Sequence, residues 1–417
     1  MGKAATSVSP LAPKLGFPTV SPIAGVRLAA GAAGVRYKGR DDVILAELAP
    51  GTTVAGVLTR SKTASAPVAW CRAGLASGGG ARGLVVNAGN ANAFTGKVGE
   101  RSVKRTAEAA AKLLGAKPSQ IFIASTGVIG EPLPEDRIID ALPSIEASLR
   151  ADSFERAARA IMTTDTFVKG ATRKARIGDA EVTIAGFCKG SGMIEPNMGT
   201  MLAFLFTDAR LPAPVLQALL GRAADRTFNC ITVDSDTSTS DTCLLFATGA
   251  VGRAQPDIER SGDARLRGFK EALEAVMRDL AHLVVRDGEG ATKFVTIRLI
   301  GASSAGAAKR LAFAVANSPL VKTAIAGQDP NWGRIVAALG KAGEPLDQAA
   351  LGVRIGGLPV AEKGARAARY DEAATAKHMK GEEIVIEIDL GLGRGAATVW
   401  TCDLTHAYID INADYRS

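Results

Sequence analysis

A single threonine stands where a loop gives way to an apolar run within residues 189–206, KGSGMIEPNMGTMLAFLF. Glycine, proline and asparagine crowd the first half of this segment, and Thr200 directly precedes the apolar residues. A threonine hydroxyl is a weak nucleophile at neutral pH unless a base removes its proton. Because the chain has only three histidines, a Ser-His-Asp triad or a histidine-built zinc site is poorly supplied. The α-amine of Thr200 would serve as the base if this residue were the first of a chain.

The precursor chain can create such a terminus by its own chemistry. Attack of the Thr200 hydroxyl on the Gly199 carbonyl moves the acyl group from nitrogen to oxygen, and water then cleaves the ester. Gly199 has no side chain to hinder the attack, and glycine tolerates unusual backbone angles. The alternative is an ordinary turn before a strand with threonine on the surface, and the local pattern by itself favours that alternative.

Three other motifs match chemical sites less well. DSDTSTSDT (234–242) resembles a calcium loop, but Thr239 and Leu245 stand where an EF-hand needs glycine and glutamate, so a hydroxyl-rich turn is favoured. GLGRGA (391–396) fits G-x-G-x-x-A, but a strand follows it where a dinucleotide site needs a helix. GASSAGAAKR (301–310) lacks the Walker lysine pattern. We therefore expect no bound metal and no nucleotide cofactor.

Composition excludes several classes of protein. The formal net charge is +8, but Lys and Arg are dispersed and aromatic residues make up only 5% of the chain, so we expect affinity for anionic small molecules rather than nucleic acid. No apolar stretch approaches the roughly 20 residues that span a bilayer. The scattered, odd-numbered cysteines predict reduced thiols in a cytoplasm. These are Cys71, Cys188, Cys230, Cys243 and Cys402.

The elements that must position Thr200 follow from apolar periodicity. Residues 264–285 carry an apolar side chain at every third or fourth position, which predicts one apolar helix face. Residues 101–118 and 211–225 are also typical of helices. Strands alternating with helices indicate α/β or α+β layers, with a softer boundary near 285–293. The predicted strands are 82–88, 120–126, 181–187, 201–206, 242–248, 294–300, 383–390 and 397–404.

The segment around Thr200 also resembles the cleavage segment of the ornithine acetyltransferase family, the glutamate N-acetyltransferases of the cyclic arginine pathway. The resemblance continues through blocks in family order and covers essentially the whole chain. The first block, 34–49, resembles the family's opening strand pair. The blocks are AGVRYKGRDDVILAEL (34–49), VAGVLTRSKTASAPV (54–68), NAGNANAFTG (87–96), ASTGVIGEPLP (124–134), IMTTDTFVK (161–169), ITVDSDTSTSDT (231–242), VRDGEGATK (285–293), GQDPNWGRI (327–335) and YIDINADYRS (408–417).

The resemblance implies roles for the reacting groups. Thr200 matches the residue that cleaves the bond after Gly199 and then serves as the acyl nucleophile. Thr126 and Gly127 match the pair that stabilises the oxyanion, one through its hydroxyl and the other through its backbone N–H. Glu195 departs from the small or neutral residues that are common at its place in the family, which bears on the efficiency of cleavage.

The same resemblance implies the residues that contact substrate, in addition to Thr200. Lys189 matches a substrate-site lysine whose ammonium can pair with a carboxylate. Thr166 matches a substrate-contacting position, and Glu289 matches a residue that contacts the substrate's α-ammonium. Asn412 and Ser417 match the C-terminal contacts, where a frayed tail is otherwise expected.

The implied architecture is an α/β fold with an α/β/β/α core and a smaller C-terminal α+β domain. Self-cleavage would divide the chain into an α chain, 1–199, and a β chain, 200–417. Residues 200–290 would complete the core, 291–400 would form the smaller domain, and 401–417 would return to the active site. Two α and two β chains would form a heterotetramer in the cytoplasm.

The implied reaction is a ping-pong transfer of the acetyl group from N2-acetyl-L-ornithine to L-glutamate through an acetyl-Thr200 enzyme. No metal or organic cofactor is implied, and the use of acetyl-CoA as a second donor stays open. One alternative is an amidohydrolase or aminopeptidase with the same N-terminal threonine, which would not need glutamate. The other is a non-catalytic homologue that stays uncut, against which the retained reacting groups argue.

Overall fold

A computed structural model describes residues 7–78, 80–195 and 201–413. The predicted cleavage junction, Gly199 and Thr200, and the predicted contact Ser417 lie outside the described residues. The chain divides into two compact units, which we name the large unit and the small unit. The large unit contains residues 13–229 and 236–284, and the small unit contains residues 7–12, 230–235 and 285–413.

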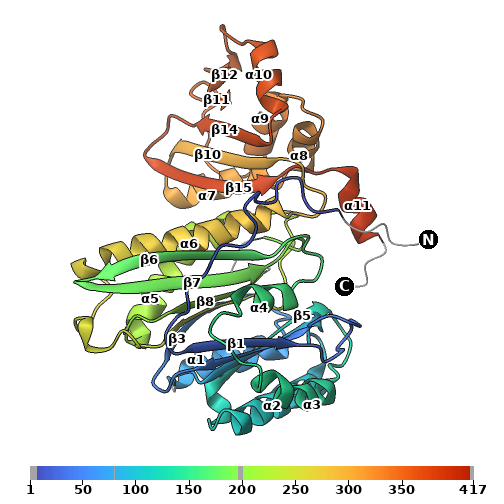
Figure 1. Cartoon of the computed structure of the whole chain (residues 1–417). Coiled ribbons are helices and arrows are strands. Elements are labelled where there is room, and N and C mark those ends of the chain that lie inside the picture. Colours follow the sequence, from blue (N-terminus) through green and yellow to red (C-terminus); the bar gives the residue numbers. More distant parts are fainter. Residues whose placement is uncertain (1–6, 79, 196–200, 414–417) are drawn as a thin grey trace. The chain divides into compact units, whose positions relative to one another are not determined.

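The large unit contains a five-stranded sheet in the order β3-β9-β8-β7-β6 (Figure 1). Its central pair, β8 and β9, is parallel and the other neighbours are antiparallel. All six residues of both central strands are buried, as expected for strands covered on both faces. The strands are β3 (Thr53–Leu58), β6 (Lys169–Ile177), β7 (Ala180–Lys189), β8 (Leu202–Thr207) and β9 (Thr242–Ala247).

A second sheet of the large unit has four strands in the order β1-β2-β4-β5. The pair β4 and β5 is parallel and the other two pairs are antiparallel. Alternate residues of β2 enter two different cores, because successive side chains of a strand point to opposite faces. The strands are β1 (Val26–Gly31), β2 (Val43–Leu48), β4 (Gly83–Asn90) and β5 (Ile121–Val128).

Phenylalanine side chains fill the space between the two sheets of the large unit. Phe122 of β5 meets Phe246 of β9 edge-on with the ring centroids 5.9 Å apart, and Phe206 of β8 stacks on Phe246 at 5.5 Å. Aromatic pairs in these geometries stabilise a core beyond the area they bury. The helix α4 (Phe154–Ala160) inserts its buried face into the same core.

Helices cover the outer faces of both sheets, so the layers run α/β/β/α, and the predicted mixed α/β class is confirmed (Figure 1). On the four-stranded sheet these helices form a separate apolar core, and Cys188 of β7 donates its thiol to the Leu280 carbonyl of α6 on the other side. The helices are α1 (Ala66–Ser77), α2 (Gly96–Leu113), α3 (Glu135–Glu146), α5 (Ala213–Arg226) and α6 (Arg267–Arg286).

The opening strand pair is not contained in 34–49, and this expectation is wrong. Only β2 falls in that block, and its partner β1 lies at Val26–Gly31. The Asp42 carboxylate accepts the backbone N–H groups of Ala33 and Val35, each at 2.7 Å, and thereby closes the intervening residues as a loop. A carboxylate bonded to several N–H groups stabilises a turn instead of a strand ladder.

The small unit has a six-stranded mixed sheet in the order β13-β12-β11-β14-β10-β15, with an apolar core on one face. The predicted strands 294–300, 383–390 and 397–404 correspond to β10, β14 and β15. Its strands are β10 (Phe294–Ala302), β11 (Gly352–Ile355), β12 (Leu358–Glu362), β13 (Ala365–Arg366), β14 (Glu383–Asp389) and β15 (Gly395–Cys402). Its helices are α7 (Ala305–Ala316), α8 (Pro319–Ala326), α9 (Trp332–Gly340), α10 (Glu372–Met379) and α11 (His406–Asn412).

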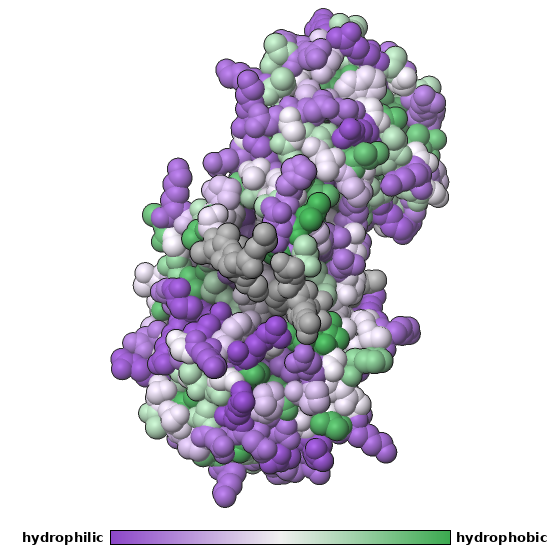
Figure 2. Space-filling view, turned by 90° about the vertical axis from the view of Figure 1, so that its right-hand side faces the viewer, coloured by the Kyte–Doolittle hydropathy of each residue, from purple (hydrophilic) through white to green (hydrophobic). Residues whose placement is uncertain are grey.

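The surface is mainly hydrophilic on the face in Figure 2, where hydrophobic residues form scattered spots. Within the described ranges, no helix combines the length and the apolar character that a membrane span requires.

Candidate active site

The predicted oxyanion pair lies at the end of β5. Thr126 follows Phe122 and Ala124 at every second position, so its side chain faces the core between the sheets. Gly127 has a φ of +132°, and a Cβ atom there would lie 2.3 Å from the carbonyl carbon of Gly89. Only glycine fits a backbone with this angle and this close approach. The strand therefore ends in a hydroxyl beside an obligatory glycine.

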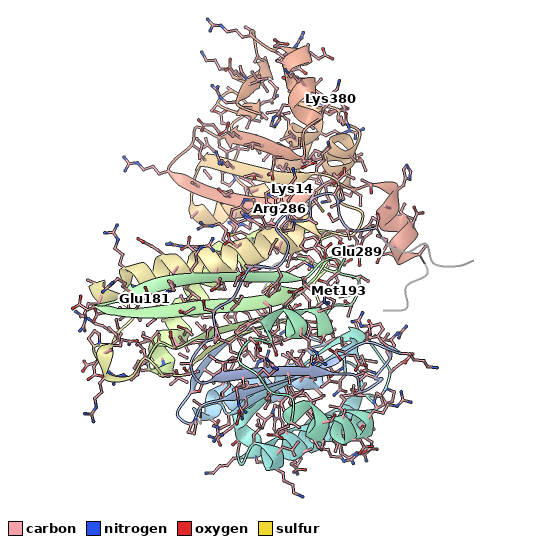
Figure 3. The ribbon with its side chains drawn as sticks, viewed as in Figure 1. Lys14, Glu181, Met193, Arg286, Glu289 and Lys380 are labelled. Atoms are coloured by element: carbon pink, nitrogen blue, oxygen red, sulfur yellow. The ribbon has the colours of Figure 1, made fainter. Side chains whose placement is uncertain are left out.

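Lys189 reaches Thr126 from the opposite sheet. It is the last residue of β7 and lies on the same face as Phe187 and Ala185, which belong to the core between the sheets. Its Nζ donates a hydrogen bond to Thr126 Oγ1 at 3.0 Å. The apolar core thus ends in a polar contact between the two sheets, at the end of β7 that leads to Met193 and opposite to Glu181 (Figure 3).

The register of β7 and β8 relates this contact to the predicted nucleophile. Lys189 pairs with Leu202, the first residue of β8. Thr200 precedes Leu202 by two positions in the chain. Whether Thr200 acts as the nucleophile stays a prediction, and so do the roles of the other site residues.

A buried ion pair lies next to Lys189. The Lys169 Nζ is 2.6 Å from Asp165 Oδ1, and both side chains are 0% exposed. The same oxygen accepts the Gly190 backbone N–H at 2.7 Å, and Asp165 Oδ2 accepts that of Thr163 at 3.1 Å. This carboxylate therefore joins the turn at 163–165 to the residue that follows Lys189.

The charge of Asp165 follows from these partners. Burial by itself would raise the pKa of Asp165, but the ammonium groups of Lys169 and Lys189 and the hydrogen bonds from Lys169 and Gly190 together hold it well below its usual range. Asp165 is therefore a carboxylate at neutral pH.

A second buried carboxyl behaves in the opposite way. Burial raises the pKa of Asp241 well above its usual range, although hydrogen bonds from the Met201 backbone and the Thr59 side chain and the charge of Lys189 lower it in part. Its Oδ2 atom has no hydrogen-bond partner among the described residues. The pKa shift of Asp241 is therefore opposite in direction to that of Asp165.

Thr166 lies on the turn that Asp165 anchors, and its side chain is half-buried. In the same turn, Thr164 and Ser191 share a hydrogen bond of 2.7 Å between their hydroxyls. The turn therefore connects a predicted substrate contact to the segment after Lys189.

Two further predicted contacts meet in the small unit. Asn412 Nδ2 donates to Glu289 Oε2 at 2.7 Å and to the Tyr408 carbonyl at 3.0 Å. The Tyr408 hydroxyl in turn donates to Asp234 Oδ2 at 3.3 Å. Glu289 is mostly buried, and a carboxylate in such a place suits a cationic ligand group.

Sequence reasoning did not find Asp165, Lys169 or Asp241. Asp165 and Lys169 are four residues apart, a spacing that brings side chains together in a helix. These two residues do not lie in a helix, so the spacing by itself does not predict the ion pair that they form. Asp241 belongs to a hydroxyl-rich turn that the sequence assigns no site role. Both carboxyls are recognisable only once the chain has folded, because burial and the residues around them set the pKa shifts.

Comparison with known proteins decides the family. The profile of the ArgJ family matches residues 27–417. The chain belongs to the ArgJ family. Arginine biosynthesis bifunctional protein ArgJ of Ruegeria pomeroyi is 58% identical over 414 residues, which cover 99% of each chain. The protein with the same description from Nitrobacter winogradskyi is 56% identical over 416 residues, which cover 99% of this chain and 100% of its own. The resemblance drawn from the sequence blocks is thus confirmed.

Solved structures include ArgJ proteins as well. The crystal structure of arginine biosynthesis bifunctional protein ArgJ from Bacillus halodurans is 34% identical, covers 51% of this chain and 98% of its own, and has a TM-score of 0.48. Ornithine acetyltransferase from Mycobacterium tuberculosis, complexed with ornithine, is 32% identical, covers 42% of this chain and 93% of its own, and has a TM-score of 0.38.

Proposed function

We propose that this ArgJ chain transfers the acetyl group of N2-acetyl-L-ornithine to L-glutamate, which gives ornithine and N-acetylglutamate. The observation that carries the proposal is the ArgJ match over residues 27–417, together with full-length relatives that are bifunctional proteins of arginine biosynthesis. The family makes the chain an acetyltransferase of arginine biosynthesis and disfavours the amidohydrolase alternative.

The first step in the proposal is self-cleavage. The Thr200 hydroxyl attacks the Gly199 carbonyl, the peptide C–N bond breaks, and an ester joins Gly199 to Thr200. Water hydrolyses this ester, which leaves a carboxylate on Gly199 and a free α-amine on Thr200. The amine then lies next to the hydroxyl that it must deprotonate.

The second step is acyl transfer. The Thr200 amine takes the proton of its own hydroxyl, and the oxygen attacks the acetyl carbonyl of N-acetylornithine. The Thr126 hydroxyl and the Gly127 N–H donate to the oxyanion, a type of contact that is worth about 3–4 kcal/mol for one donor. Ornithine leaves with a proton on its nitrogen, and the amine of glutamate then attacks the acetyl-Thr200 ester and takes the acetyl group.

Substrate recognition in this proposal uses charge. Lys189 attracts a substrate carboxylate, Glu289 attracts an ammonium, and Thr166, Asn412 and Ser417 supply polar contacts. Support comes from the buried carboxylate of Glu289 with its Asn412 partner and from the Lys189 ammonium at the end of the core. Acetyl-CoA serves as a second acetyl donor, which accounts for a bifunctional enzyme, and it is a substrate rather than a resident cofactor. No metal takes part.

We further propose that the α and β chains stay together after cleavage, that two of each form a heterotetramer, and that the enzyme works in the cytoplasm. These points rest on the family resemblance alone.

The intact mass of the denatured protein tests the proposal first. We expect the wild type to separate into chains of residues 1–199 and 200–417, Thr200→Ser to cleave more slowly or equally, and Thr200→Ala to stay whole. An assay for ornithine with and without glutamate follows. Sustained release of ornithine only in the presence of glutamate supports the transferase. Release without glutamate would instead support the hydrolase alternative. An uncut wild type would overturn the assignment of Thr200.

A further inference from the structure

The hydrogen bond between Lys189 and Thr126 has only one possible direction. A lysine ammonium has three donors and no acceptor, so Lys189 Nζ donates and Thr126 Oγ1 accepts at 3.0 Å. The Thr126 hydroxyl therefore keeps its own proton for another acceptor. A charge-assisted bond to the oxygen polarises the hydroxyl and strengthens it as a donor. This is the state that an oxyanion donor needs.

Asp165 fixes the chain immediately after Lys189. Its Oδ1 accepts the backbone N–H of Gly190 at 2.7 Å, and Gly190 has a φ of +149° at the exit of β7. Its Oδ2 accepts the N–H of Thr163 at 3.1 Å, so the carboxylate plane is set from two sides. The position from which the Lys189 side chain starts thus depends on this carboxylate.

Lys169 determines which group Lys189 bonds. Because Lys169 Nζ already lies 2.6 Å from Asp165 Oδ1, this carboxylate has a counter-ion within hydrogen-bonding distance. Lys189 is near enough for its charge to lower the pKa of Asp165, a carboxyl whose burial acts in the other direction, and its Nζ donates to Thr126 Oγ1. Without Lys169 the bare carboxylate would compete with Thr126 for the ammonium.

We propose that Asp165, with Lys169 as its buried counter-ion, is a positioning residue that directs the Lys189 ammonium onto Thr126 and so orients the oxyanion donor. This inference rests on the proposed function, because it assumes that the Thr126 hydroxyl faces the acyl oxygen. In this proposal Asp165 acts through Lys189.

A double-mutant cycle tests the inference. One arm is Thr126→Val, which keeps the shape and removes the hydroxyl. The other arm is the charge-balanced pair Asp165→Asn with Lys169→Gln, which avoids an uncompensated buried charge. We expect Thr126→Val to lower kcat by about 10²–10³-fold and the pair to lower it about tenfold or more. In the combined variant, kcat should equal that of Thr126→Val within about twofold, because no hydroxyl is left for Lys189 to direct.

Asp42→Asn is the matched control. Asp42 is fully buried in the same unit, and its carboxylate accepts the backbone N–H groups of the loop 33–35, including that of Val35 at 2.7 Å. We expect this change to lower the melting temperature and to leave kcat unchanged per cut chain. The intact mass of the denatured protein gives the fraction of cut chains for every variant. For any variant that stays mostly uncut, the rate of self-cleavage replaces kcat in the double-mutant cycle.

Each outcome decides something. Coupling between the pair and Thr126 in transfer or cleavage supports the inference. If the effects of Thr126→Val and of the charge-balanced pair multiply independently in both transfer and cleavage, the inference is overturned, and the proposed function is unaffected. If Thr126→Val leaves both rates unchanged, the oxyanion assignment in the proposed function fails, and this inference fails with it.

Discussion

Two buried carboxyls near Lys189 have pKa values that are shifted in opposite directions. Asp165 and Asp241 are both almost completely buried, and Lys189 lowers the pKa of each. Asp165 has Lys169 at 2.6 Å and its pKa is lowered, whereas Asp241 has no such counter-ion at hydrogen-bonding distance among the described residues and its pKa is raised. Burial therefore does not by itself set the direction of a carboxyl's pKa shift in this site. A counter-ion at hydrogen-bonding distance decides it.

The largest effect that would test this comparison comes from removing the counter-ion. In a Thr200→Ala background, in which every variant should stay one chain, Lys169→Met should lower the free energy of unfolding by about 3–5 kcal/mol, because it strands a buried carboxylate. The midpoint of urea unfolding measures the change.

Lys174→Met is the control for that experiment, because Lys174 pairs with Glu181 at 2.8 Å on the neighbouring strand with both side chains exposed. Its effect should stay below about 1 kcal/mol. Equal effects of the two lysine substitutions would show that the buried pair contributes no more than a surface pair.

The pH dependence of stability should have opposite signs for the two carboxyls. The pKa of Asp165 is lowered in the folded state, so its contribution is present above about pH 4, the pKa of an unfolded aspartate, and disappears as the pH falls. The cost of Asp165→Asn, measured by unfolding between pH 3 and pH 7, should therefore be greatest near pH 7.

The folded-state pKa of Asp241 is raised, so the stability it contributes is lost as the pH rises above about 4. Asp241→Asn should therefore gain stability relative to its parent between pH 4 and pH 7, by about 1.4 kcal/mol for each unit by which the pKa is raised within that window. Parallel pH curves for Asp241→Asn and Asp165→Asn would contradict the assignment of charges.

The polar pair of the small unit extends the comparison to a carboxylate held by an amide. Asn412→Ala removes the hydrogen-bond donor that lies 2.7 Å from Glu289. We expect the KM for the ornithine substrate to rise about tenfold, because losing the bond that holds the carboxylate in place should cost about 1.4 kcal/mol of binding free energy. Steady-state kinetics should show kcat within about twofold of the parent. Asn331→Ala, at the cap of α9, should leave KM unchanged. A fall in kcat at constant KM would show that Asn412 is not a substrate-binding contact.

The smallest effect concerns a neutral partner of Asp241. Thr59→Val removes a hydroxyl that donates to the Ser238 carbonyl at 2.9 Å, and it leaves the bond from the Thr59 backbone N–H to the Asp241 carbonyl at 3.0 Å in place. We expect a loss of about 1 kcal/mol in the free energy of unfolding. Thr172→Val on β6, which loses a bond of 3.2 Å to the Ile184 carbonyl of β7, should cost no more. A loss as large as that of Lys169→Met would mean that this neutral hydroxyl contributes as much to stability as the buried counter-ion.

Several strands were predictable because alternating or continuous apolar runs leave few other structures. The runs at 181–187 and 242–248 became β7 and β9 for this reason. The strand β6 escaped prediction, since KGATRKARI has several charged residues that the exposed face of an edge strand accommodates. The loop before β2 was mistaken for a strand because the sequence does not show that the Asp42 carboxylate would bond its backbone.

The family, the mixed α/β class and the position of the lone threonine before an apolar strand could all be inferred from the sequence, because these depend on residue types in a fixed order. Only the tertiary structure decided that Thr126 and Lys189 meet, although 62 residues separate them between β5 and β7 of different sheets. It also decided the direction in which the pKa of each buried carboxyl is shifted. Ionisation depends on the distance to a counter-ion and on exclusion of water, and neither is a property of the chain before it folds.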